Sequence, residues 1–148
     1  VIMRRRLPKG VRMYTGDDFN YPELIAGDEQ GYSHALLGIF DPIAPLAARG
    51  VKLLGEGDVK GFHDALDPTV PLARVIFQAP TQYYKTGVVF LAWLNGFQDH
   101  FVMLNGAQSM RSLQPFTEIF RLADGCGLLR NPDLAVRRMK SLLSVYGA

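Results

Sequence analysis

Two adjacent aspartates, Asp17 and Asp18, directly follow Gly16 at the end of a short apolar segment. A carboxylate pair can bind a metal ion when further oxygen or nitrogen ligands lie nearby, and Asp41 would join them if it reaches the same place. The pair could also act as a general acid and base, although the sequence identifies no partner for that chemistry. The third interpretation is a turn whose carboxylates accept backbone N–H groups near a helix start. We favour the turn and keep the other two interpretations open.

The lysines decide whether the chain can form an imine with a carbonyl substrate, because that reaction needs an uncharged amine as the nucleophile. The chain has five of them, Lys9, Lys52, Lys60, Lys85 and Lys140. Lys85 stands out because its sequence neighbours are aromatic and apolar, and burial would lower its pKa. We favour a lysine near a helix start whose stem packs on apolar surface while its ammonium group reaches solvent.

The remaining reactive side chains show no pattern of a metal or nucleophile site. His34, His63 and His100 lack metal-ligand spacing, and we expect them to be structural or to face solvent. The single cysteine, Cys126, excludes an intrachain disulfide and a cysteine-cluster zinc site, and we expect it to be inert. We expect no cofactor and no metal.

Two strands joined through a helix should position the aspartates. Residues 11–15 predict the first strand, Asn20 can cap a helix over residues 22–26, and the unbroken apolar run 35–40 predicts the second strand. Strands joined through a helix are expected to be parallel. A sheet of two strands is marginal by itself, so we expect these strands to be the last two of a larger sheet in a barrel or a doubly wound fold.

The rest of the chain reads as helices. Asp41-Pro42 predicts a helix start, with that helix running to about residue 54, and Asp58 predicts the next cap. Asn131, before Pro132 and Asp133, predicts the start of the last helix. Residues 97–111 show no clear period. The later helices have apolar stripes, one formed by Leu113, Phe116, Ile119, Phe120 and Ala123 and the other by Val136, Met139, Leu143 and Tyr146.

Composition excludes several classes of protein. The chain has 148 residues, of which 48% are hydrophobic and 20% are charged, with a net charge of +2. That charge is too small to favour nucleic acid, and no apolar run reaches the roughly 20 residues of a membrane span. The arginines at residues 4–6 are not followed by the apolar core of a secretory signal. We expect a cytoplasmic protein that binds neither nucleic acid nor a membrane.

Three features resemble the C-terminal third of the dihydrodipicolinate synthase and N-acetylneuraminate lyase family, which are Schiff-base class I aldolases on a (β/α)8 barrel. The first is Gly-Asp-Asp at residues 16–18, where the family has the end of its seventh strand. The second is the apolar segment 35–40 at the eighth strand. The third is residues 76–85, IFQAPTQYYK, at the family's Phe-x-Glu-Pro-Asn-Pro-x-x-x-Lys position. The amino-acid sequence of residues 14–25 is similar to that of an uncharacterised bacterial synthase-like branch of the family.

The resemblance implies a lyase that acts on a small 2-oxo acid such as pyruvate through a lysine imine, as a homo-oligomer. It places substrate binding at Gly16, Asp17, Asp18, Leu36 and Gly38, and the backbone carbonyl of Leu36 would face the substrate. The family's imine-forming lysine lies on the sixth strand, which would precede Val1. We therefore expect this chain to be a C-terminal fragment without a catalytic residue of its own, and inactive alone.

The sequence departs from the family at the end of the second strand, where Gly38-Ile-Phe40 and Asp41 replace a Ser or Thr followed by a loop with Asn, and at residues 78–81. Because of these departures, the resemblance does not imply that the chain shares the substrate of dihydrodipicolinate synthase. We expect an α/β, helix-rich chain, with residues 1–56 forming the last two units of a TIM barrel and residues 57–148 a helical extension. The alternatives are a metal-dependent barrel enzyme using Asp17, Asp18 and Asp41, and a non-catalytic helical interaction module.

Overall fold

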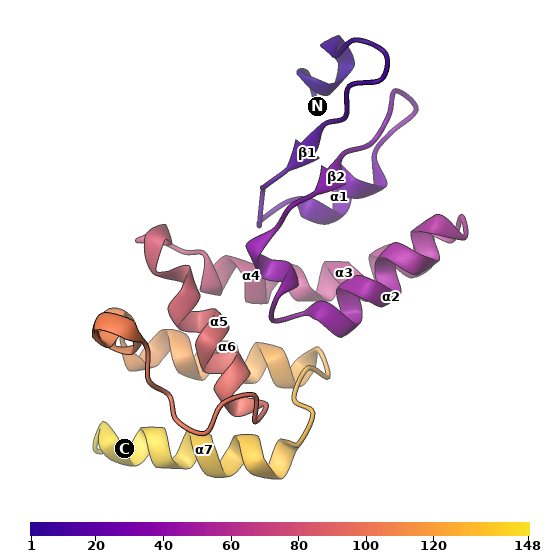
Figure 1. Ribbon diagram of the computed structural model, residues 1–148. Helices are drawn as coiled ribbons and strands as arrows, with labels where there is room; N and C mark the ends of the chain where they lie inside the picture. Colours follow the sequence, from indigo (N-terminus) through magenta and orange to yellow (C-terminus); the bar gives the residue numbers. More distant parts are fainter. The chain divides into compact units, whose positions relative to one another are not determined.

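Two short parallel strands, β1 (Tyr14–Thr15) and β2 (His34–Ala35), are joined through helix α1 (Tyr21–Ala26) in the computed structural model, which describes residues 1–148 (Figure 1). Tyr14 is paired with His34 and Thr15 with Ala35. The parallel direction and the helical connection confirm the prediction from sequence. The chain is helix-rich α/β, and this sheet has two strands.

Both strands are shorter than predicted. Residues 35–40 were expected to form one strand, but β2 ends at Ala35 and Gly38–Phe40 form a short 3-10 helix, η2. The physical reason is the length of the ladder: Leu36 N still donates to Thr15 O at 3.0 Å, and β1 then ends, which leaves the later residues without a strand partner. An apolar run alone does not form a strand without a neighbour to pair with.

The contacts divide the chain into two compact units, Val1–Val70 and Pro71–Ala148. The boundary lies inside the segment that we assigned to the helical extension. Besides the sheet, α1 and η2, the first unit contains η1 (Arg4–Arg6), α2 (Ala44–Gly55), α3 (Val59–Leu66) and η3 (Asp67–Thr69). Helix α4 (Val70–Ile76) begins at the boundary, and the second unit continues with η4 (Thr81–Tyr83), α5 (Tyr84–Leu94), η5 (Leu104–Met110), α6 (Leu113–Gly125) and α7 (Pro132–Val145).

The predicted helix caps at Asp58 and Asn131 form, and those at Asn20 and Asp41 do not. Asn20 directly precedes α1, but its side chain makes no capping hydrogen bond. Asp58 accepts the backbone N–H of Gly61 at 2.8 Å, and Asn131 accepts that of Leu134 at 3.0 Å, as N-caps do. The prediction that Asp41 caps the next helix is wrong. Helix α2 begins only at Ala44, because η2 and a turn occupy residues 38–43.

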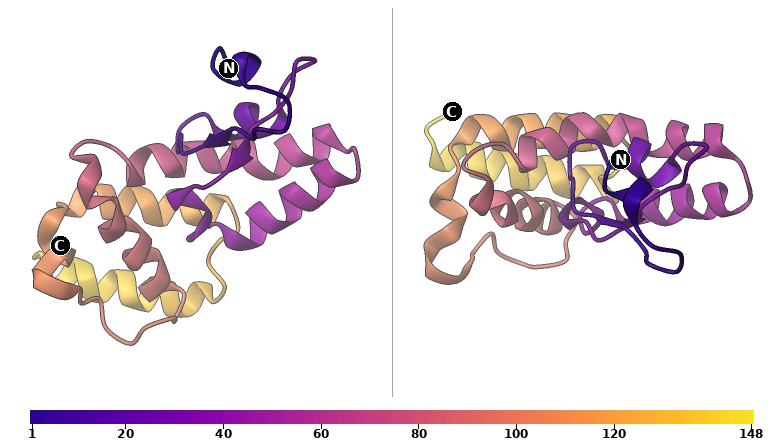
Figure 2. Two further views of the ribbon diagram at one scale, coloured as in Figure 1. Left: turned by 45° about the horizontal axis from the view of Figure 1, so that its top comes forward. Right: turned by 90° about the horizontal axis from the view of Figure 1, so that it is seen from above.

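In the first unit, α2 and α3 lie side by side (Figures 1 and 2). A Cβ added to Gly50 would lie 3.0 Å from the Leu66 side chain, so a glycine allows this close approach. The hydroxyl group of buried Tyr21 on α1 is hydrogen-bonded to that of buried Thr69. The core of this unit is therefore built between α1, α2 and α3.

In the second unit, α5 packs against α6 and α7, and the rings of Phe90 and Phe116 lie 4.8 Å apart. The predicted stripe of α6 is confirmed at Phe116, Ile119 and Ala123, which are buried. The predicted stripe of α7 is confirmed at Met139, which is buried, and is wrong at Val136 and Tyr146, which are exposed; Ala135 is buried in place of Val136. The neighbouring helices therefore bury the i, i+4 pair Ala135 and Met139, which shares only Met139 with the predicted face. No helix of the chain is both long enough and apolar enough to cross a membrane.

Candidate functional site

The five residues that sequence indicated follow the same ends of the two strands. Because β1 and β2 are parallel, Gly16, Asp17 and Asp18 leave β1 at the edge where Leu36 and Gly38 leave β2. A Cβ added to Gly16 would lie 3.8 Å from the Leu36 carbonyl oxygen, an ordinary contact. The two predicted segments therefore meet, and the packing around Gly16 does not itself require a glycine.

Asp17 builds the turn between β1 and α1. Its carboxylate accepts the backbone N–H of Phe19 at 2.8 Å and of Asn20 at 3.1 Å, and the side-chain amide of Asn20 at 3.0 Å. Burial opposes the charge of Asp17, but these donors outweigh it and lower the pKa of the carboxyl group below its ordinary value. Asp17 therefore forms the turn that the sequence predicts.

Asp18 makes a long-range contact that the sequence did not indicate. Its carboxylate accepts the backbone N–H of Ile39 at 2.8 Å, so it joins the end of β1 to the 3-10 helix that follows β2. Burial raises the pKa of Asp18, the N–H groups of Ile39 and Gly38 counteract that rise, and the neighbouring charge of Asp17 adds to it. The two adjacent carboxyl groups therefore have pKa values that move in opposite directions.

One face of the small sheet is open. Tyr14 is 56% exposed and Leu36 is 79% exposed, whereas Thr15, which points to the other face, is buried. His34 lies on the open face, with its ring 5.3 Å from that of its strand partner Tyr14 and 5.4 Å from that of Tyr32. The open face is thus aromatic and apolar and leads to the strand ends that carry the two aspartates.

The chain supplies neither a buried amine nor a cluster of metal ligands. All five lysines are exposed, and the ammonium group of Lys85 lies 5.4 Å from the centre of the Tyr84 ring. No group of three or more His, Cys, Asp or Glu side chains is placed to hold a metal ion, so Asp17, Asp18 and Asp41 do not form such a set. Cys126 has a raised pKa because of burial, which disfavours the reactive thiolate.

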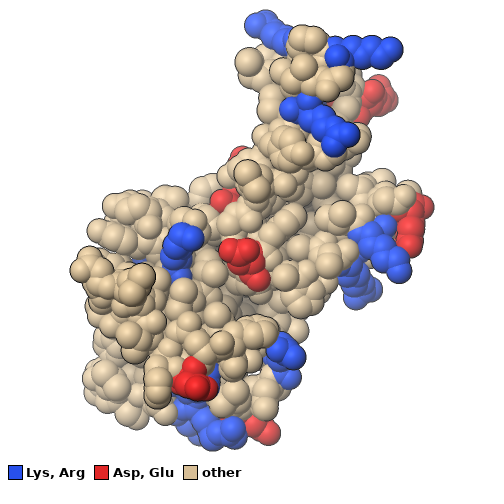
Figure 3. Space-filling model, viewed as in Figure 1, with Lys and Arg blue, Asp and Glu red and all other residues tan.

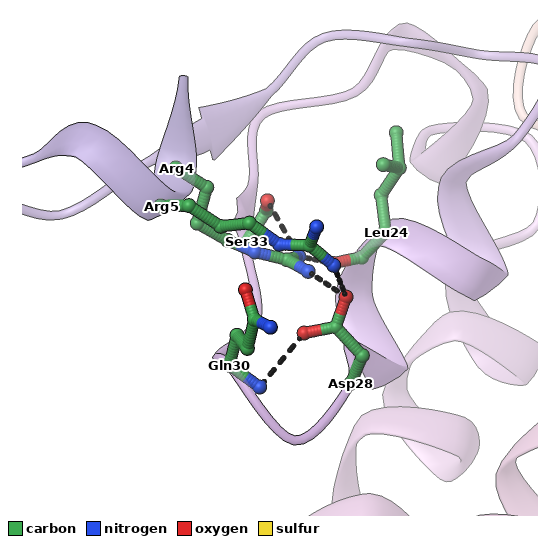
Figure 4. A network of polar contacts seen from close by, with 6 residues as sticks. All are labelled: Arg4, Arg5, Leu24, Asp28, Gln30 and Ser33. Atoms are coloured by element: carbon green, nitrogen blue, oxygen red, sulfur yellow. Dashed lines mark hydrogen bonds and ion pairs between the residues drawn. The ribbon is translucent and has the colours of Figure 1, made fainter. Parts of the chain in front are cut away.

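A polar network fastens the segment before β1 to the segment before β2 (Figure 4). Arg4 and Arg5 both bind the carboxylate of Asp28, at 3.1 and 3.0 Å, and Arg4 donates to the Leu24 carbonyl at 3.3 Å. The pKa of Asp28 is lowered, first by the backbone N–H of Gln30 and then by the arginines. Arg4 and Arg5 belong to the short 3-10 helix η1, and their contacts fasten this helix to the end of the sheet opposite the candidate site.

Arg111 is a second residue whose role the sequence did not reveal. It is buried, and its guanidinium group donates to the carbonyl groups of Ile76, Gln78, Ala79 and Pro80, at 2.8 to 3.4 Å. Burial lowers the pKa of the guanidinium group. Arg111 therefore holds the first half of the segment 76–85, whose likeness to a family motif was noted from sequence. No local pattern could identify its partners, which lie 31 to 35 residues away.

Figure 3 shows the charged side chains on one face of the chain. On this face, basic and acidic side chains are scattered in small groups among uncharged atoms.

A search of curated proteins finds no match to the chain. The model of one family, described as protein of unknown function (DUF993), matches residues 1–148, and the chain therefore belongs to the DUF993 family.

Proposed function

We propose that this chain is the C-terminal part of a (β/α)8-barrel lyase of the dihydrodipicolinate synthase type, with β1 and β2 as the seventh and eighth strands. The whole enzyme would condense or cleave a small 2-oxo acid such as pyruvate through a lysine imine. The observation that carries the proposal is the meeting of residues 16–18 with residues 36–39 at the carboxyl ends of two parallel strands, through the Asp18–Ile39 hydrogen bond. In such barrels substrates bind at that end of the strands.

The unpaired edges of the sheet support further strands on both sides. β1 and β2 pair only with each other. In the observed register, His34 N donates to Met13 O and Leu36 N to Thr15 O, so the backbone groups of Tyr14 and Ala35 point to the outer edges. Parallel strands are normally buried on both faces and paired along the sheet. The open aromatic face of Tyr14, His34 and Leu36 is what a barrel would enclose.

The proposed roles of the site residues follow from their contacts. Asp17 holds the turn, and Asp18 holds the loop after β2 so that the Leu36 carbonyl stays at the strand end. The raised pKa of Asp18 keeps a proton on this carboxyl group to a higher pH than on an ordinary aspartate, which suits a group beside a substrate that exchanges protons. Since all five lysines are exposed, we place the imine-forming amine outside this chain.

Borohydride trapping tests the proposal. The full-length gene product and the isolated 148-residue chain are each incubated with pyruvate and sodium borohydride, and their intact masses are measured. An amine that attacks the ketone loses water to form an imine, which borohydride reduces to a stable amine. We expect a stable adduct on the full-length protein alone.

The isolated chain serves as the internal control, because its exposed lysines have the same chance of nonspecific reduction. Peptide mapping then locates any adduct. An adduct at Lys85 of the isolated chain, or the absence of an adduct on the full-length protein with a range of 2-oxo acids, would refute the assignment.

A further inference from the structure

The tripeptide Leu-Asn-Gly occurs twice in the second unit, at residues 94–96 and 104–106. Asparagine is a thermolabile residue, and a following glycine favours its deamidation because no side chain keeps the glycine nitrogen away from the asparagine amide. The reaction requires the side chain and the next backbone nitrogen to leave their hydrogen bonds and approach each other. The two copies share these three residues, so a large difference in their reactivity must come from the fold.

Asn95 is held in place at the end of α5. It is half-buried, its side-chain amide donates to Leu91 O at 3.1 Å, and its amide oxygen accepts the backbone N–H of Arg130 at 2.8 Å. The N–H group of Gly96 donates to Trp93 O at 3.0 Å. Cyclisation at Asn95 therefore requires that both ends of its amide group and the following backbone nitrogen are released.

Asn105 lies at the tip of the loop before α6, and its side chain is free. This side chain is exposed and has no hydrogen-bond partner. The backbone of Asn105 has φ 57°, a left-handed conformation that is unfavourable for a residue with a side chain. The turn is closed by Gly106 N–H, which donates to Met103 O at 3.2 Å, and a Cβ added to Gly106 would meet no atom within 4 Å. Opening of the turn therefore breaks one hydrogen bond and relieves an unfavourable φ.

The residues on either side of this tip are fixed. Buried Thr86 donates its hydroxyl group to Ala107 O at 2.8 Å, and the side-chain carbonyl of Gln108 accepts Met103 N–H at 3.0 Å. Exposed tips of this kind open locally without unfolding of the elements beside them. Residues 104–106 can thus reach a reactive conformation while α5 and α6 stay folded.

We propose that Asn105 is a site of spontaneous deamidation and that the fold protects Asn95. When the turn opens, the Gly106 nitrogen gives its proton to water or hydroxide and bonds to the side-chain carbonyl carbon of Asn105. The bond from that carbon to the amide nitrogen breaks, ammonia leaves, and a cyclic imide remains. Water then opens the imide at either carbonyl group, which yields aspartate or isoaspartate without any oxidant or reductant. The product carries a new negative charge beside exposed Leu104, and this proposal does not depend on the proposed lyase activity.

Ageing of the folded 148-residue chain at neutral pH, followed by digestion and peptide mapping at acidic pH, measures the conversion at each asparagine. Release of Asn95 breaks two side-chain hydrogen bonds that Asn105 does not make. Two hydrogen bonds of ordinary strength correspond to about a thirtyfold change in an equilibrium constant, so Asn105 should react roughly thirtyfold faster than Asn95. Labelling with a protein isoaspartyl methyltransferase identifies the isoaspartate product.

The same chain in denaturing urea is the matched control, because both Leu-Asn-Gly segments then lack their folded contacts. We expect similar rates at Asn95 and Asn105 under these conditions. Asn105→Gly removes the reactive amide and keeps a residue that adopts positive φ readily. The folded variant should gain no negative charge on ion-exchange chromatography over the period in which the parent chain does.

Circular dichroism confirms that the aged chain and the variant keep the helical content of the parent. Equal rates at Asn95 and Asn105 in the folded chain would overturn the proposal. So would an undiminished preference for Asn105 in urea, or a folded chain that leaves Asn105 intact while its unfolded form reacts there.

Discussion

Replacement of Asp18 by alanine tests whether its carboxylate joins the two strand ends. The change removes the acceptor of the Ile39 N–H group, which lies 2.8 Å from the carboxylate oxygen. A hydrogen bond to a charged group contributes about 1.5 to 3 kcal/mol. Asp18 is only half-buried, and solvent weakens the bond, so the loss should fall at the lower limit, about 1.5 kcal/mol.

Hydrogen exchange at the Ile39 amide is the most local measurement of this loss. A free-energy change of about 1.5 kcal/mol corresponds to roughly a tenfold change in an equilibrium constant. We therefore expect Ile39 to exchange about tenfold faster in Asp18→Ala, with a matching decrease in the free energy of unfolding in urea.

Asp18→Asn is the control, since its amide oxygen can still accept the bond and should retain most of the Ile39 protection. Asp17→Ala should deprotect Phe19 and Asn20 and leave Ile39 unchanged. Unchanged exchange at Ile39 in Asp18→Ala would refute the role that we assign to this carboxylate.

Three further changes test the contacts described above. The pKa of Asp17 is lowered in the folded state, so Asp17 stabilises the fold above its unfolded pKa of about 3.9, and this stabilisation is lost as the pH falls. The pKa of Asp18 is raised in the folded state, so the free energy of unfolding decreases as the pH rises from about 3.9 through the folded pKa of Asp18. Urea unfolding across acidic pH should therefore show Asp17→Asn and Asp18→Asn removing dependences of opposite sign. Gly27→Ala should lower the free energy of unfolding by more than about 2 kcal/mol, because φ is 78° and the added Cβ would lie 2.4 Å from a carbonyl oxygen. Gly57→Ala is the control: φ is 85° but no atom lies within 4 Å of the added Cβ, so the loss should be about 1 kcal/mol. Arg111→Met should lower the free energy of unfolding by about 3 kcal/mol, since four carbonyl groups lose their donor, and a thermal melt equal to that of the parent chain would contradict this.

The parts of the fold that depend on neighbouring residues could be predicted. The caps of Asp58 and Asn131 form as the sequence indicates, because an N-cap binds a backbone N–H three residues away. The Asp17 turn is equally local, with both of its backbone donors within three residues. The parallel direction of the strands followed from the helix between them.

The tertiary structure decided what no local pattern contains. β2 ends at Ala35 because its ladder partner ends, although the apolar sequence continues to Phe40. The packing of α5 and α6 against α7 selects Ala135 in place of Val136 for burial.

The candidate site likewise combines features that the sequence indicated with features that only the tertiary structure reveals. The family resemblance placed Gly16, Asp17, Asp18, Leu36 and Gly38 in one substrate-binding site, and the parallel pairing of β1 and β2 brings the two segments to the same edge of the sheet. Only the folded chain reveals that Asp18 binds Ile39, a residue 21 positions away, and that this contact separates the behaviour of two adjacent aspartates. Local hydrogen bonds are encoded within one turn of chain, whereas burial and long-range partners arise only when distant segments pack.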